Sequence, residues 1–427
     1  MVGLSTSTNG TAETVESLNE LALLADTAGA EVMEQILQAR RSIDPSTFIG
    51  RGKAEEIADL CKDLDIDLVI FDDDLSPGQV KNLDKKIERR ILDRSGLILD
   101  IFASRAKSRQ ARIQVELAQL QYMMPRLTRQ WDHLSRQEGG VGSGGAIGVR
   151  GPGETQLEID RRLIRAKIKH LTKQLKTVEG YYNLQRKQRS EMFCTALVGY
   201  TNAGKSTVFN KITSASTLVE DRLFATLDST TRAIDVGLGQ KILLSDTVGF
   251  ISKLPHHLIS SFKSTLTEVY SADLLLHVVD VSHPAFEEHM ITVSAVLDEL
   301  GASKLPSVVV FNKIDLLEEN GLLNKLRADF PGCIAISALN PEDVVFLCER
   351  IGQIVGQTRV EEFDLFIPYK AAGVLSALYE AGQILTREDE PKGVRITVRL
   401  EPATAKRLHK RLEQYLFDAE PAGGQGR

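Results

Sequence analysis

The pattern of apolar and polar positions changes several times along this 427-residue chain. Residues 15–26 show the periodicity of an amphipathic helix. Short apolar runs then alternate with helical stretches, in the order 32–37, 53–63, 67–71, 77–87 and 90–92. Such an alternation favours a small open α/β layer. We therefore predict an N-terminal α/β domain over residues 15–103, preceded by a polar, disordered start over residues 1–14.

From residue 105 to residue 190 the apolar spacing is that of two narrow helical stripes. The first stripe contains Ile113, Leu117, Leu120, Met124, Leu127, Trp131 and Leu134. The second stripe contains Ile164, Ile168, Leu171, Leu175 and Val178. Between them, 8 of the 15 residues in 139–153 are glycine, which is too flexible for helix or strand. We predict a long antiparallel helical hairpin over 104–190 with a mobile glycine tip, and a kink at Pro125.

The remaining chain again alternates buried-strand and helix patterns. Apolar runs at 193–198, 241–245, 308–311 and 333–336 predict strands of a mostly parallel, doubly wound sheet over residues 191–357. The tail, residues 358–427, has the pattern strand, helix, strand, strand, helix, with an amphipathic last helix at 403–417. The predicted fold class is α/β, with a small α+β domain at the C-terminal end.

Charge is distributed unevenly along the chain. The net charge is −6, yet residues 104–190 hold 18 Lys and Arg against 7 Asp and Glu, a local +11, which leaves about −17 elsewhere. A basic hairpin in an acidic chain indicates an anionic partner, and we predict structured RNA. The predicted RNA-binding residues are Arg126, Arg129, Arg136 and Arg150.

Residue usage also excludes some classes of protein. The four cysteines are scattered without paired or metal-ligand spacing, so we expect neither a disulfide nor a zinc site. The first residues lack the charged and apolar regions of a signal peptide, and no apolar run reaches transmembrane length. We predict a cytoplasmic protein.

The strand at 193–198 leads into a phosphate-binding pattern, G-x-x-x-x-G-K-S, at residues 199–206. Two glycines allow the backbone to curl so that its N–H groups face a polyphosphate, the lysine offers a positive charge, and the serine hydroxyl can ligate Mg²⁺. The predicted nucleotide-binding residues here are Gly199, Tyr200, Thr201, Asn202, Ala203, Gly204, Lys205 and Ser206.

Two later motifs select guanine over adenine. The N-K-x-D motif supplies Asn312, Lys313, Ile314 and Asp315. Its aspartate can accept hydrogen bonds from two guanine nitrogens that adenine does not offer as donors. A second motif supplies Ser337, Ala338 and Leu339, which suit a backbone contact to the guanine O6. Together with the phosphate loop, these motifs predict a GTP and GDP site.

Two segments between these motifs have the character of switches. A D-x-x-G motif comprises Asp246, Thr247, Val248 and Gly249, whose aspartate would reach Mg²⁺ through water. The first switch comprises Phe224, Ala225, Thr226, Leu227 and Asp228. For Mg²⁺ we predict Ser206 and Thr226 as ligands, with Thr230 as the alternative threonine, and for catalysis Lys205, Thr226 and Gly249.

The chain resembles the HflX family of P-loop GTPases, within the translation-factor-like class. The resemblance rests on residues 48–57, 91–106, 114–129, 150–162 and 224–232, together with the GTPase motifs. It implies a monomeric GTPase that binds the large (50S) ribosomal subunit and its rRNA, with a role in splitting or rescuing ribosomes or in their biogenesis. It also implies ATP binding by the N-terminal domain, where a G-x-G-K turn occurs at residues 50–53, and it leaves loose membrane association open.

Phe250 follows the D-x-x-G motif, where many GTPases have a glutamine that orients water. A phenyl ring cannot do so, which predicts slow hydrolysis that a ribosome or a bound cation stimulates. The loop resembles that of GTPases that use a potassium ion and have asparagine at the position of Asn202. The resemblance implies potassium as the candidate cation, held by Asn202, although this asparagine has the alternative role of stabilising its turn. A second function class also remains open, a passive RNA-binding protein with GTP as a structural ligand.

Overall fold

The computed structural model describes residues 1–7, 10–129, 152–189, 192–213, 223–224, 226–237, 240–253, 255, 267–317, 321–358, 361–400, 412 and 415. They form two compact units, Met1–Ile234 with Ile242–Val344, and Asp235–Lys241 with Val345–Arg427. Among the helices of this described part, none is long and apolar enough to cross a membrane.

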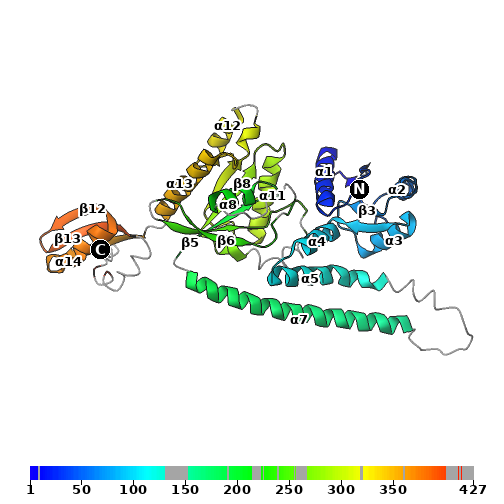
Figure 1. Cartoon of the computed structure of the whole chain (residues 1–427), viewed down its shortest axis with the longest axis horizontal. Helices are drawn as coiled ribbons and strands as arrows, with labels where there is room; N and C mark the ends of the chain where they lie inside the picture. The colour runs from blue at the N-terminus through cyan, green and yellow to red at the C-terminus, as the bar shows by residue number, and fades with distance from the viewer. Residues whose placement is uncertain are drawn as a thin grey trace, which may run out of the picture. The chain divides into compact units, whose positions relative to one another are not determined.

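The N-terminal layer is a four-stranded parallel sheet in the order β2-β1-β3-β4 (Figure 1). Its strands are β1 (Val2–Ser5), β2 (Ile36–Ala39), β3 (Leu68–Phe71) and β4 (Arg90–Asp93). Its helices are α1 (Thr11–Thr27), α2 (Arg51–Asp63), α3 (Pro77–Ile87) and α4 (Arg94–Arg105). The three helices and three strands predicted from the apolar pattern are all present, with the strand expected at 32–37 shifted to begin at Ile36.

The disordered start predicted over residues 1–14 is wrong. Strand β1 lies between β2 and β3, and its Val2 and Leu4 are buried. Leu18 of α1 packs so closely over Gly3 that a Cβ there would come within 2.9 Å of its side chain. The apolar pattern did not reveal this strand, because the strand has only two large apolar side chains. The glycine between these two residues allows α1 to approach the strand closely.

The basic region contains α5 (Arg109–Met123) and α7 (Pro152–Arg189), which pack along each other (Figure 1). Their common seam buries four members of the predicted stripes, Ile113, Leu117, Leu171 and Leu175. The predicted hairpin therefore has the expected helical pairing. Trp131, Leu134, Arg136, Arg150 and most of the glycine tip lie outside the described residues.

The kink predicted at Pro125 is wrong. Helix α5 ends at Met123, and Pro125 lies in the 3₁₀ segment η1 (Met124–Arg129). Proline lacks the N–H that an α-helix needs, and its ring clashes with the preceding turn. Here these effects end the α-helix rather than bend it.

Arg126 of η1, which we predicted to contact RNA, has partners within the fold. Its guanidinium lies 2.7 Å from Oδ2 of Asp93 and 3.5 Å from the centre of the Tyr122 ring, and it donates to the carbonyl oxygen of Leu75. The Asp93 carboxylate is fully buried and also accepts hydrogen bonds from the Gly96 N–H and the Tyr122 hydroxyl. The Arg126 charge is therefore already compensated within the fold, and its contact with RNA stays a prediction.

We expect Arg126→Ala to lower the free energy of unfolding by about 2–3 kcal/mol, because the buried Asp93 carboxylate loses its cation. Denaturant unfolding followed by circular dichroism measures the change. The matched control is Arg109→Ala, since Arg109 is exposed on α5 and should cost less than about 0.5 kcal/mol. Equal losses in the two variants would contradict the structural role of Arg126.

The second sheet has the strand order β10-β9-β8-β5-β7-β6. Its strands are β5 (Phe193–Gly199), β6 (Thr230–Asp235), β7 (Lys241–Asp246), β8 (Leu274–Asp280), β9 (Ser307–Asn312) and β10 (Ile334–Ala335). The helical segments of this region are α8 (Lys205–Thr213), α10 (Thr267–Tyr270), α11 (Phe286–Glu299), η2 (Ile314–Leu316), α12 (Gly321–Asp329) and α13 (Pro341–Thr358). Parallel pairing joins β7 to β5, β5 to β8, β8 to β9 and β9 to β10, which confirms the predicted doubly wound α/β fold.

The C-terminal sheet is antiparallel and has the order β11-β13-β12. Its elements are β11 (Glu361–Pro368), η3 (Tyr369–Ala371), α14 (Ala372–Ala381), β12 (Gly382–Glu390) and β13 (Gly393–Leu400). Leu365, Leu378 and Ile396 are fully buried between the sheet and its helix. The first four elements of the predicted tail are confirmed, and the helix predicted at 403–417 lies outside the described residues except for Leu412 and Tyr415.

Candidate nucleotide-binding site

The turn from β5 to α8 contains the phosphate-binding pattern, and its shape requires both glycines. Gly199 has a φ of 151° and Gly204 a φ of 90°, which side chains disfavour. A Cβ at Gly199 would clash with the Val278 carbonyl oxygen, and one at Gly204 would clash with the Asn312 amide. The turn therefore brings the unpaired N–H groups at the start of α8 to the edge of a cavity, an arrangement suited to phosphate.

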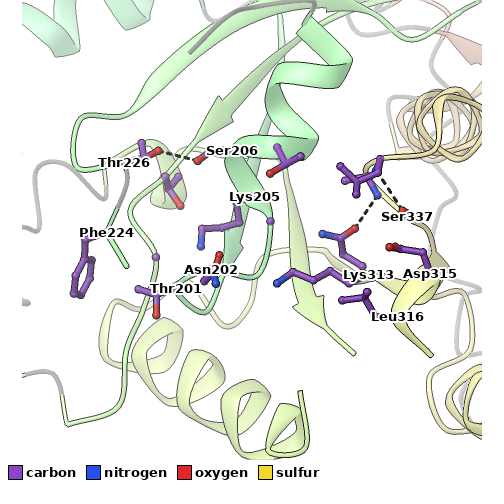
Figure 2. Close-up of a pocket in the computed structure, with 17 residues that line it drawn as sticks. Thr201, Asn202, Lys205, Ser206, Phe224, Thr226, Lys313, Asp315, Leu316 and Ser337 are labelled. Carbon is purple, nitrogen blue, oxygen red and sulfur yellow. Dashed lines mark hydrogen bonds between the residues drawn. The ribbon is translucent and has the colours of Figure 1, made fainter. Parts of the chain in front are cut away.

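The cavity has a volume of about 440 Å³, and Lys205 lies in its wall (Figure 2). Lys205 is 5% exposed, and its Nζ donates to the carbonyl oxygens of Gly199 at 3.1 Å and Tyr200 at 2.6 Å. Burial lowers the pKa of this ammonium group to about 8. Gly249 lies so close that a Cβ there would be 2.9 Å from the ammonium nitrogen. A phosphate bound here would place negative charge beside this buried ammonium group and raise its pKa.

Three oxygen-bearing side chains meet at one end of the cavity. The Ser206 hydroxyl lies 2.7 Å from both the Thr226 hydroxyl and Oδ2 of Asp246, and Thr226 lies 3.2 Å from the same carboxylate oxygen. Within the described residues, the other carboxylate oxygen of Asp246 is buried without a hydrogen-bond partner, and burial raises the pKa of this group. An all-oxygen set with an unsatisfied carboxylate oxygen fits a hard divalent cation such as Mg²⁺. The geometry favours Thr226 over Thr230, which belongs to β6.

The opposite end of the cavity has the features of a base pocket (Figure 2). Asn312 is buried, donates to the Ala203 carbonyl oxygen at 3.0 Å and accepts from the Ala338 N–H at 3.0 Å. It thus ties the phosphate loop to the segment around residue 338, and it also lines the cavity. Asp315 lines the same cavity, and so do two exposed leucines, Leu316 and Leu339, which are 60% and 68% exposed.

The two leucines and Asp315 suit one planar base. A base placed against Asp315 would cover apolar leucine surface that is otherwise in contact with water. The aspartate carboxylate can then accept two hydrogen bonds in the plane of the base. Guanine offers that pair of donors.

Phe250 does not face the cavity. Its side chain is 2% exposed and belongs to the apolar core, while its backbone pairs with the phosphate loop through Thr201 N–H at 2.7 Å and the Gly199 carbonyl oxygen at 3.1 Å. No hydrogen-bonding side chain therefore comes from this position to orient water.

Most of the predicted nucleotide-binding residues line the cavity: Thr201, Asn202, Gly204, Lys205, Ser206, Phe224, Thr226, Thr247, Gly249, Asn312, Lys313, Asp315, Ser337, Ala338 and Leu339. Within the described part of the chain, the predicted residues absent from the lining are Gly199, Tyr200, Ala203, Leu227, Asp228, Asp246, Val248 and Ile314. Ala225 lies outside the described residues. Thr207 and Leu316 line the cavity although we did not predict them, and each directly follows a predicted motif residue.

Three family models match the chain. One described as "GTP-binding GTPase N-terminal" matches residues 15–103, one described as "GTP-binding GTPase Middle Region" matches residues 105–189, and one described as "50S ribosome-binding GTPase" matches residues 194–313. The three matches follow one another along the chain, and the last contains the phosphate loop, both switches and the start of the N-K-x-D motif.

Curated relatives are similar over nearly the whole length. GTPase HflX from Magnetococcus marinus is 46% identical over 403 residues, which cover 93% of this chain and 91% of the relative. GTPase HflX from Caldanaerobacter subterraneus subsp. tengcongensis is 44% identical, with 93% and 90% covered. GTPase HflX from Escherichia coli is 41% identical, with 95% and 94% covered. Because identities of 41–46% extend over 93–95% of the chain, the chain belongs to the HflX family of GTPases.

Proposed function

We propose that this chain hydrolyses GTP and that its nucleotide state controls its binding to the large ribosomal subunit, in ribosome splitting, rescue or biogenesis. The observation that supports this most is the meeting of Ser206, Thr226 and Asp246 at one end of the cavity, beside Gly249 and Lys205. A site that only stores GTP as a structural ligand has no need of switch residues placed to detect the γ-phosphate.

Ribosome affinity in different nucleotide states tests the proposal. We expect the 50S subunit to be bound at least about tenfold more tightly with a non-hydrolysable GTP analogue than with GDP, because only the triphosphate holds both switches. Sedimentation of the full chain with purified subunits measures this. Equal affinity in both states, without hydrolysis, would favour the alternative of a passive RNA-binding protein.

The surface of α7 that faces away from α5 supports RNA binding. Five exposed cations recur at steps of three and four residues, Arg162, Arg165, Lys169, Lys173 and Lys176. That spacing puts them along one face of the helix. The buried Leu171 and Leu175 belong to the opposite face, which packs on α5. We call these five residues the basic stripe, and we add it to Arg126, Arg129, Arg136 and Arg150 as a proposed phosphate contact.

We expect the triple variant Arg165→Gln, Lys169→Gln and Lys173→Gln to bind ribosomal RNA about 10- to 100-fold more weakly and to reduce the salt dependence of binding by about 2 units of slope. Filter binding over a series of salt concentrations measures both quantities. The matched control replaces three exposed cations of the GTPase region, Lys304, Lys325 and Arg327, by glutamine. A control that loses as much affinity would show that total charge matters and that the basic stripe does not.

Potassium is the proposed substitute for the missing glutamine. Asn202 lines the cavity and has a φ of 59°, a conformation that asparagine tolerates, so it also shapes the turn. If its side chain helps to hold K⁺ between the phosphates, basal hydrolysis should be about tenfold faster in K⁺ than in Na⁺ at equal ionic strength. Asn202→Ala should remove that preference, and the exposed Asn324→Ala on α12 should keep it. Equal rates in both salts would leave the ribosome as the activator.

ATP binding by the N-terminal domain has little support from the geometry. In the turn at residues 50–53, the Gly50 N–H donates to Oε1 of Gln38 at 2.9 Å, and Lys53 lies 2.6 Å from the Glu56 carboxylate of the same helix, so both groups already have partners. By contrast, nucleotide binding in the cavity beside Lys205 explains why the phosphate loop has its two glycines and why the lysine is buried. A protein of this function would act in the cytoplasm, where ribosomes are.

A further inference from the structure

The first switch is attached to the start of the hairpin. The Asp228 carboxylate accepts hydrogen bonds from the backbone N–H groups of Lys107 at 3.1 Å and Ser108 at 2.9 Å, and from the Ser108 hydroxyl. Ser108 is in turn the N-cap of α5, because its hydroxyl accepts from the Ala111 N–H at 3.0 Å. A carboxylate in this place satisfies unpaired N–H groups and interacts favourably with the positive end of the helix.

The other end of the same switch segment is attached to α4. The Phe224 ring packs edge-to-face on Phe102, with ring centres 4.7 Å apart and an angle of 82° between the rings. Phe224 is 2% exposed and has a φ of 54°, a conformation that bulky residues rarely adopt. A strained backbone of this kind persists only where packing holds the side chain.

Thr226 lies midway between these two attachments. It is two residues from Phe224 and two from Asp228, and its hydroxyl is 2.7 Å from Ser206. A segment of five residues fixed at both ends has few paths open to it, so its central side chain has a restricted position. Neither Phe224 nor Asp228 needs to touch the metal or the phosphates for this effect.

We propose that the corner between α4 and α5, residues 102–108, positions the first switch, with Asp228 and Phe224 as positioning residues for Thr226. The inference rests on the proposed function, since it assigns a role in sensing GTP. It also gives the hairpin a connection to the nucleotide, because α5 is the hairpin's first helix. Coupling of this kind is reciprocal: capture of the γ-phosphate by Thr226 stabilises the Asp228 contact with α5, and a partner that holds α5 favours the GTP-bound switch.

Nucleotide affinities of the full-length Asp228→Asn variant test the inference. The amide keeps the size of the side chain but loses the charge and one acceptor oxygen. We expect a non-hydrolysable GTP analogue with Mg²⁺ to bind about tenfold more weakly, because only the triphosphate uses Thr226, and GDP to bind within about twofold of wild type. Asp329→Asn, at an exposed aspartate of α12, is the matched control and should change neither affinity.

Two further measurements separate positioning from a purely structural role. In wild type, hydrogen exchange at residues 109–113 should slow when the analogue replaces GDP, and in Asp228→Asn this difference should disappear. Phe102→Leu removes the second attachment while keeping an apolar side chain, and it should weaken analogue binding about threefold with GDP unaffected.

Two outcomes would overturn the inference or its basis. An unchanged ratio of analogue to GDP affinity in Asp228→Asn would remove it, whether both affinities stay the same or both fall equally, as a general structural defect would produce. A wild-type chain that binds both nucleotides alike and does not hydrolyse GTP would instead remove the proposed function, together with any role for Asp228 in sensing GTP.

Discussion

The Asp315→Asn variant should bind GTP about 10²-fold more weakly than wild type, a loss of about 3 kcal/mol, and should gain affinity for xanthosine triphosphate. The aspartate carboxylate accepts from two guanine nitrogens, and an amide presents its own donor to one of them. Xanthine has an oxygen at that position and can accept from the amide. Competition titrations with a fluorescent nucleotide measure both affinities.

The gain for xanthine is the decisive half of this prediction, because misfolding cannot produce it. Asp298→Asn, at an exposed aspartate of α11, makes the same chemical change away from the cavity and should leave both affinities unchanged. An Asp315→Asn variant that still prefers GTP over xanthosine triphosphate by a wide margin would show that another group selects the base. The exposed Leu316 and Leu339 are retained in this variant, so contact of the base with these two leucines would then be sufficient for the remaining preference.

The parts of the site that are local in sequence were predictable. The phosphate loop needs its glycines, lysine and serine within eight residues, so Gly199, Gly204, Lys205 and Ser206 identify it without knowledge of the fold. Strands with several branched apolar residues, such as β8 and β9, are likewise visible from the pattern. Each of these features depends on neighbours along the chain.

The features that were missed depend on partners far away in sequence. Strand β1 becomes recognisable only when Leu18 is seen over Gly3, and Arg126 looks like any surface arginine until Asp93, 33 residues earlier, is placed beside it. A basic residue contributes the same charge to the composition of its region whether it binds RNA or an internal carboxylate. Composition therefore predicts the sign of the charge on a surface but not which residues form that surface.

Arg94 is a further residue whose partners lie far away in sequence. One of these partners belongs to the second switch, the segment that begins with the D-x-x-G motif. This arginine is 1% exposed, pairs with Glu20 and with Asp72 at 2.7 Å, and donates to the Ser252 hydroxyl at 3.2 Å. Ser252 follows the D-x-x-G motif, and its N–H donates to the Tyr200 hydroxyl of the phosphate loop at 2.7 Å. The N-terminal layer thus contacts the second switch as well as the first. No sequence motif indicates this network, because its members come from separate segments with no fixed spacing.

The contacts of the N-terminal layer with both switches are relevant to GTP hydrolysis. Removing the charge of a partner such as Glu20 would leave Arg94 buried beside one carboxylate rather than two, so the whole network is expected to respond together. The nucleotide site is consequently not an independent module in this chain. Residues outside the cavity lining therefore contact both switches.

Thr226→Ala should slow GTP hydrolysis about 10²-fold and abolish most of the preference for a triphosphate analogue over GDP. The variant removes one oxygen from the set that meets at Ser206 and leaves the Ser206 contact with Asp246, 2.7 Å long, in place. Binding of GDP should therefore stay within about twofold of wild type, since the first switch senses only the γ-phosphate. Phosphate release under single-turnover conditions measures the rate, and nucleotide titrations in Mg²⁺ measure the preference.

Thr230→Ala is the matched control, because it removes the same methyl and hydroxyl groups four residues later, from strand β6. Its rate should remain within about threefold of wild type, since surface substitutions away from a site have small effects. Thr226→Ser keeps the hydroxyl and should recover most of the lost rate, which identifies the oxygen rather than the methyl group as the active part. A larger loss in Thr230→Ala than in Thr226→Ala would transfer the metal-ligand role to Thr230. It would also imply that the hydroxyl contact between Ser206 and Thr226 is broken when GTP is bound.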